Sequence, residues 1–193
     1  MSIEKSFRKM KLAGYLSIQN QLPTESTEEY ELRVLAVALG LSIERVRSIP
    51  SKQTFNLKER MAKIEFEPQK MRGDIKVGKV WYKVDWNLTD ITAGQYIDLS
   101  AFAVSEANIH KSLACLLRPC KFYKWFPSKY SGAKHPAISE HLLDNMTIEQ
   151  ARPLMVFFCT LLQESVEATQ TYLESQMKEL ETLLHKNGDG SQQ

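Results

Sequence analysis

A β-hairpin signal within an otherwise helical pattern constrains this fold most strongly. Residues 75–102 read IKVGKVWYKVDWNLTDITAGQYIDLSAF, in which apolar positions flank a turn at Gly78. Glycine takes the positive φ that a short hairpin loop needs, so the sequence predicts a tight hairpin there. Thr89 or Asp90 is predicted to cap the helix that follows. The apolar residues of the hairpin are Ile75, Val77, Trp81 and Val84.

Helix signals dominate the rest of the chain. The sequence STEE at 26–29 is a capping box, and the helix that it opens is predicted to stop at Gly40. Ser42 is predicted to cap a short helix, and TIEQ at 147–150 is a second capping box. Further helices are predicted at about 92–103 and 106–117, the second of them ended by Pro119.

These patterns predict a mainly α fold with a small β-hairpin, arranged as a helical bundle plus a long C-terminal helix. With 43% hydrophobic residues, the chain of 193 residues can bury a core without a metal or a disulfide. The predicted parts are an N-terminal helical part at 1–62 that opens with one amphipathic helix over 1–20, a hairpin region at 63–88, a central helical part at 89–165 packed with the former as one domain, an amphipathic C-terminal helix at 166–186 and a disordered tail at 187–193.

A segment rich in basic and aromatic residues spans 118–136 and is predicted to be an ordered loop or a partner surface rather than a regular element. Its lysines and aromatic rings suit three roles: binding to single-stranded nucleic acid, inward anchoring of the loop, and contact with an acidic protein surface. The basic residues concerned are Arg118, Lys121, Lys124, Lys129 and Lys134, and the aromatic ones are Phe122, Tyr123, Trp125, Phe126 and Tyr130.

Charge is uneven although the net charge is only +2. No acid lies between Glu106 and Glu140, whereas eight acids and two bases lie from Glu140 to Glu181. This asymmetry favours pairing within the chain or between subunits. The apolar stripe of the predicted C-terminal helix has two interpretations, packing on its own domain or pairing with another chain in an oligomer. The stripe consists of Val166, Leu173, Met177, Leu180 and Leu184.

The start of the chain lacks an apolar signal segment, and the longest apolar run, 154–162, is about half of what a membrane span needs. Together with three cysteines, this predicts reduced thiols in a cytosol.

Catalytic motifs are absent from the sequence, which shows no phosphate loop, dinucleotide fingerprint or nucleophile elbow. We therefore predict a protein that is not an enzyme and uses no cofactor. Among the carboxylates, Asp85 and Asp98 come nearest to a catalytic setting, and we interpret them as a strand-exposed and a helix-surface residue. His110 and His185 are predicted to be surface residues.

One loose zinc-like spacing joins Cys115, Cys120, His135 and His141. Cys115 lies in the apolar run SLACLL, where a free cysteine behaves as a small hydrophobic residue. Because the core does not need a metal to fold, the sequence favours no metal site here.

The segments KVWYKVDWNLT (79–89), DITAGQYIDLSAF (90–102) and MTIEQARPLMVFFCTLL (146–162) follow one another in a layout that resembles tail assembly chaperones and related small morphogenesis proteins of tailed bacteriophages. EYELRVLAVALGLSIERVRSIP (29–50) is similar to their N-terminal helical part, and the resemblance covers about residues 10–165. The long C-terminal helix departs from this layout.

The resemblance implies a protein of the host cytoplasm that shields the apolar face of a tape-measure protein before the tail tube assembles. The alternatives are a structural protein of the virion, such as a head–tail connector or tail ring subunit, and a nucleic-acid-binding accessory protein acting through 118–134. The predicted partner contacts are Trp81, Tyr82, Trp86, Arg118, Lys121, Lys124, Trp125, Phe126, Leu173, Met177, Leu180 and Leu184.

Overall fold

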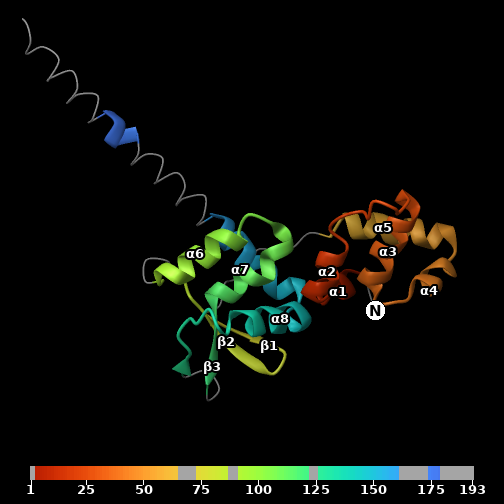
Figure 1. Cartoon of the computed structure of the whole chain (residues 1–193). Helices are drawn as coiled ribbons and strands as arrows, with labels where there is room; N and C mark the ends of the chain where they lie inside the picture. Colours follow the sequence, from red (N-terminus) through yellow and green to blue (C-terminus); the bar gives the residue numbers. More distant parts are fainter. Residues whose placement is uncertain (1–2, 65–72, 87–90, 122–125, 161–173, 179–193) are drawn as a thin grey trace, which may run out of the picture. The chain divides into compact units, whose positions relative to one another are not determined.

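The computed structural model describes residues 3–64, 73–86, 91–121, 126–160 and 174–178. Most of these residues are helical, and short strands form a four-stranded antiparallel sheet in the order β1-β2-β3-β4 (Figure 1). The prediction of a mainly helical fold with a minor β component is therefore confirmed. By their internal contacts the residues divide into two units, Met1–Leu154 and Met155–Gln193. The finer predicted boundaries stay a prediction.

The elements of the first unit follow a simple order along the chain. They are α1 (Ile3–Arg8), α2 (Leu12–Ser17), α3 (Thr27–Leu39), α4 (Ile43–Arg47), α5 (Ser51–Ala62), β1 (Asp74–Val77), β2 (Val80–Val84), α6 (Ala93–Phe102), the 3-10 helix η2 (Glu106–Asn108), α7 (Ile109–Leu116), β3 (Leu117–Lys121), β4 (Phe126–Pro127) and α8 (His135–Asn145). Residues 148–160 and 174–178 are also helical. The remainder of the predicted C-terminal helix and the tail lie outside the described residues.

The N-terminal segment forms two short helices, α1 and α2, where one helix over 1–20 was predicted. The break occurs because the backbone between them pairs with the residues that follow α8. The amide of Leu12 donates to the carbonyl of Met146 at 2.8 Å, and the amide of Ile148 donates to the carbonyl of Met10 at 2.9 Å. Leu12 and Met146, which share the first of these bonds, are both 0% exposed and therefore belong to the core.

Helix boundaries follow the predicted capping chemistry at both capping boxes. The Ser26 hydroxyl accepts from the Glu29 amide while the Glu29 carboxylate accepts from the Ser26 amide. Thr147 and Gln150 make the same reciprocal pair at 3.1 and 3.3 Å. Gly40 ends α3 with φ 66°, a conformation that favours glycine.

Two other predicted helices form close to their predicted bounds, but different residues set their ends. Thr92 caps α6 by accepting a hydrogen bond from the Gln95 amide at 3.2 Å, whereas the predicted caps Thr89 and Asp90 lie outside the described residues. The helix predicted over 106–117 begins as η2, continues as α7 and ends at Leu116, before Pro119.

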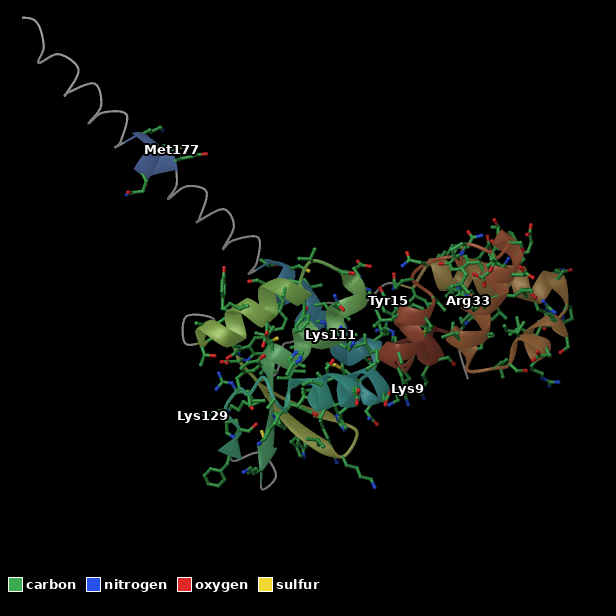
Figure 2. The ribbon with its side chains drawn as sticks, viewed as in Figure 1. Lys9, Tyr15, Arg33, Lys111, Lys129 and Met177 are labelled. Carbon is green, nitrogen blue, oxygen red and sulfur yellow. The ribbon has the colours of Figure 1, made fainter. Side chains whose placement is uncertain are left out.

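An ionic network attaches the segment before α3 to that helix. The guanidinium of Arg33, a residue labelled in Figure 2, donates to both carboxylate oxygens of Glu25, from Nε at 2.8 Å and from Nη2 at 2.7 Å. It also donates to the carbonyls of Ser17 and Asn20. Tyr30 adds a hydrogen bond to the carbonyl of Ile18 at 2.9 Å. A bidentate arginine–carboxylate pair is among the stronger polar contacts in proteins.

This network predicts an acid-sensitive contribution to stability. The hydrogen bonds from Arg33 hold the pKa of Glu25 below its ordinary value of 4.5. Because the folded pKa is depressed, the contribution is complete above pH 4.5 and is lost as the pH falls through the folded pKa. We expect Glu25→Gln to destabilise the protein at pH 7 and to flatten the decline below pH 4.5 in urea unfolding. Glu28→Gln, on the exposed first turn of α3, should leave the decline unchanged.

The hairpin forms as predicted, with Val77 opposite Val80 across the Gly78–Lys79 turn. Gly78 has φ 57°, and a Cβ there would lie 3.3 Å from Oδ1 of Asn145. Backbone conformation and space both favour glycine at this position. On β2, Tyr82 is 2% exposed and belongs to the core.

The sheet extends beyond the hairpin into β3 and β4, so the prediction that 118–136 contains no regular element is wrong for these two strands, although residues 128–134 between β4 and α8 do form a loop. The chain passes from α7 directly into β3, which pairs with β2 and places Pro119 opposite Tyr82. The two last α7 carbonyls find partners elsewhere, since Cys115 O accepts from Gln95 Nε2 at 2.8 Å and Leu116 O accepts from the Asp85 amide at 2.9 Å. These bonds satisfy groups that a helix end leaves open, so the switch to a strand needs no loop.

Candidate functional site

Helix α6, in the central part of the chain, exposes apolar side chains on one of its faces. Along α6 and the turn after it, Tyr96 is 55% exposed, Ile97 is 64% exposed and Val104 is 86% exposed. Ala93 and Ala101 are exposed beside them. We call these five residues the α6 face. Large apolar side chains grouped on one ordered element are typical of a surface that another molecule covers.

The α6 face points outward because the opposite side of the helix is buried. Gln95 and Leu99, one helical turn apart, are 1% and 2% exposed. Gln95 is held by its hydrogen bond to the end of α7, and α6 packs along α7 (Figure 1). Because 3.6 residues complete a turn, burying Gln95 and Leu99 turns Ala93, Ile97 and Ala101 to the exposed side.

The α6 helix carries a single charged side chain, Asp98, and that carboxylate accepts a hydrogen bond from the Tyr130 hydroxyl. Burial, with the bond to Asp98, holds the pKa of Tyr130 above its ordinary value, so the phenol keeps its proton and donates. The α6 face therefore offers apolar contact without a charge of its own.

A basic loop adjoins α6 through this contact. Tyr130 belongs to the segment 128–134 before α8, and a Cβ on Gly132 would lie 3.9 Å from Oδ2 of Asp98. Lys129 and Lys134 on this loop are exposed, and Lys129 is labelled in Figure 2. Among the described residues, neither lysine lies within ion-pair distance of a carboxylate. The loop also borders a shallow hollow with a volume of about 10 Å³, room for roughly one water.

The predicted partner residues of the hairpin lie at different depths. Trp81 and Trp86 are half-buried, and Lys76 Nζ lies 5.8 Å from the ring centre of Trp81. The Tyr82 hydroxyl lies 2.9 Å from Nδ1 of His141, and burial raises the pKa of Tyr82 to about 12. At 2% exposure, Tyr82 has little surface left for a partner.

The predicted partner residues of the basic segment also differ. Arg118 pairs with Asp85, and both side chains are mostly covered, at 27% and 14% exposure. Lys121 is exposed and Phe126 is 63% exposed. Of the C-terminal stripe, Met177 is 58% exposed. The other predicted contacts, Lys124, Trp125, Leu173, Leu180 and Leu184, lie outside the described residues.

The four residues of the zinc-like spacing do not come together. Cys115 Sγ lies 3.5 Å from His135 Nε2, but Cys120 Sγ contacts the carbonyl of Arg118 and His141 contacts Tyr82. Among the described residues, no three His, Cys, Asp or Glu side chains form a group that could hold a metal ion.

The Cys115–His135 pair also lacks the arrangement of a catalytic dyad. His135 Nε2 lies 2.9 Å from the carbonyl oxygen of Lys111, which only accepts, so Nε2 must carry a proton and cannot take one from the thiol. Burial raises the pKa of Cys115 to about 12, which keeps the thiol protonated at neutral pH. The pair therefore supports the core, where His135 stacks on Phe102 at 5.0 Å between ring centres.

Three residues expected on the surface are more enclosed than predicted. Asp85 follows β2 and is paired with Arg118, and Asp98 is half-buried against Tyr130. His110 is half-buried with its Nδ1 enclosed, and burial lowers its pKa below the ordinary value. His185 lies outside the described residues.

Sequence reasoning missed the α6 face. The signal that could have revealed it is the run TAGQYIDLSAFAV at 92–104, in which Asp98 is the only charge. A globular helix with one buried face normally carries several charges on the other, so this run is unusual.

Comparisons with protein-family models, curated proteins and solved structures gave no match. Within the part of the chain that the structure describes, none of the helices has both the length and the apolar character needed to cross a bilayer.

Proposed function

We propose that this chain is a non-enzymatic bacteriophage morphogenesis protein, a tail assembly chaperone that shields a tape-measure protein before the tail tube assembles around it. The observation that carries the proposal is the exposed, uncharged α6 face. The opposite side of the same helix is fixed by the buried residues Gln95 and Leu99. The sequence resemblance over residues 10–165 supplies the biological setting.

The proposed mechanism is reversible covering of apolar surface. A tape-measure protein is long, helical and apolar along one face, so it aggregates unless that face is covered. A preformed apolar surface such as the α6 face covers one stretch of it at little cost in ordering, since α6 is already packed and capped. Tube subunits that bind the same stretch more tightly then displace the chaperone.

We further propose that residues 166–186 form the amphipathic C-terminal helix that their pattern predicts. Residues 174–178 are helical, and Met177 is 58% exposed, so its side chain is accessible to a partner. The stripe that includes Met177 then binds the tape-measure protein or a second copy of this chain.

The proposal places the protein in the host cytoplasm and not in the finished virion. Co-expression with a tape-measure fragment tests it: the fragment should move from the insoluble to the soluble fraction several-fold and co-purify with this chain. A fragment that stays insoluble contradicts the proposal. Mass spectrometry of virions and infected-cell lysate supplies the second test, because stoichiometric presence in virions would indicate a connector or ring subunit instead.

A further inference from the structure

The edge of α6 beside the basic loop combines small residues with open space. Gly94, Asp98 and Ala101 are spaced by four and three residues, so they lie on one side of the helix. Ile97 lies one turn from both Gly94 and Ala101, and it is 64% exposed. A Cβ on Gly94 would meet no atom within 4 Å. At the exposed residues Gly94 and Ala101, a second helix can therefore approach α6 closely.

The basic loop is attached to this same edge. Asp98 accepts from the Tyr130 hydroxyl, and Gly132 lies against the Asp98 carboxylate. Lys129 directly precedes Tyr130 and Lys134 lies two residues after Gly132, so these two exposed lysines flank the points at which the loop meets α6. Exposed lysines that border an apolar strip attract carboxylates on the molecule that covers it.

The size of the α6 face argues against a second copy of this chain as its occupant. α6 has 10 residues and is therefore about 15 Å long. Stable protein interfaces use about 20–30 residues a side. Two copies paired through this face alone would bury too little surface to stay together. A helix of about 20 residues is about 30 Å long, so it can extend past both ends of α6 and bury surface outside the α6 face as well.

From these observations we propose that the α6 face and the lysines of the basic loop form a docking surface for an amphipathic helix whose apolar stripe is edged with Asp and Glu. This inference rests on the proposed function and narrows its partner: the stretch of tape-measure protein that binds α6 carries acidic residues beside its apolar stripe. Ile97 supplies the apolar contact, and Lys129 and Lys134 favour Asp and Glu along the edge of the bound helix.

Binding of synthetic peptides to the full-length protein tests the docking surface. Three peptides of about 20 residues, long enough to form helix on binding, share one apolar stripe and carry Glu, Gln or Lys along its edges. Fluorescence anisotropy should show the Glu-edged peptide binding about tenfold more tightly than the Gln-edged one at low salt, with the difference shrinking as salt screens the lysines. Equal affinity for the three peptides would overturn the proposal.

Two variants locate the surface. Ile97→Glu should weaken binding of the Glu-edged peptide about tenfold or more, whereas Phe55→Glu, at a residue 62% exposed on α5, should not. Reversing charge at Lys129 and Lys134 together should shift the preference to the Lys-edged peptide, whereas the same change at Lys52 and Lys63, both exposed near the ends of α5, should not. Equal losses in the variants and their controls would overturn the proposal. Circular dichroism checks that each variant is folded.

The remaining outcomes separate this inference from the proposed function. If Ile97→Glu still keeps a co-expressed tape-measure fragment soluble, the surface is wrong while the chaperone function stands. If the wild-type chain fails to keep that fragment soluble but shows the peptide preference, the function is wrong and the surface stands. If Ile97→Glu converts an oligomer of the free protein into a monomer by analytical ultracentrifugation, the face is occupied by a second copy and the proposal fails.

Discussion

Replacing Leu12 by alanine is expected to lower the free energy of unfolding by about 2–5 kcal/mol, the range seen when a fully buried leucine is truncated. Leu12 is 0% exposed, and it begins α2 immediately after the backbone bridge to the residues behind α8. The backbone bond from Leu12 to Met146 restrains the surroundings, so the site cannot collapse to fill the space left by the side chain.

Equilibrium urea unfolding followed by circular dichroism measures this effect. The matched control is Leu22→Ala, because Leu22 is 55% exposed and its truncation should change stability by less than about 0.5 kcal/mol. Similar losses for the two variants would show that Leu12 is not part of the cooperative core. An unchanged slope against urea concentration would confirm that the loss lies in stability and not in compactness.

The features that the sequence predicted well are those set by neighbouring residues. The Ser26–Glu29 and Thr147–Gln150 capping boxes and the Gly78 turn depend on contacts within a few positions, and all three form as predicted. Their chemistry needs no information about the rest of the fold, since side chain and backbone partner lie on the same turn.

The features that the sequence missed depend on distant partners. The helix breaks at Met10 because the carbonyl of Met10 accepts a hydrogen bond from the amide of Ile148, which lies far along the chain. The strand β3 forms because β2 is available to pair with it, although Pro119 argues locally against a regular element. Local propensity cannot reveal either pairing, because both are decided by which segments meet in the folded chain.

The α6 face was missed for a related reason. Its pattern showed where a helix would form, but the outward direction of Ile97 depends on Gln95 being drawn to the end of α7. A polar residue at 1% exposure is hard to predict from sequence, because glutamine is mostly found on surfaces. Without that anchor, either side of this helix could have faced the core, because a single charge, Asp98, is too little to mark one side as exposed.

His135→Ala is expected to lower the free energy of unfolding by about 2–4 kcal/mol, since it removes a buried ring and leaves a polar group without its partner. His135 is 6% exposed and lies parallel to Phe102, with ring centres 5.0 Å apart and planes inclined by 13°. Its Nε2 donates to the carbonyl of Lys111 at 2.9 Å, and Tyr130 packs against the ring edge-on. The side chain thus joins α6, α7 and the basic loop at the start of α8.

Two further variants separate the causes of this loss. His135→Phe keeps a stacked ring but removes the donor, so it should recover the packing part and still lose about 1–2 kcal/mol for the bond. Lys134→Ala, at the adjacent exposed residue, should change stability by less than about 0.5 kcal/mol.

Because Tyr130 contacts both His135 and Asp98, loosening His135 should also release the loop that carries Lys129. His135→Ala should therefore reduce the preference for the Glu-edged peptide while leaving the Ile97 contact in place, and a preference that survives would show that the loop is held by Asp98 alone.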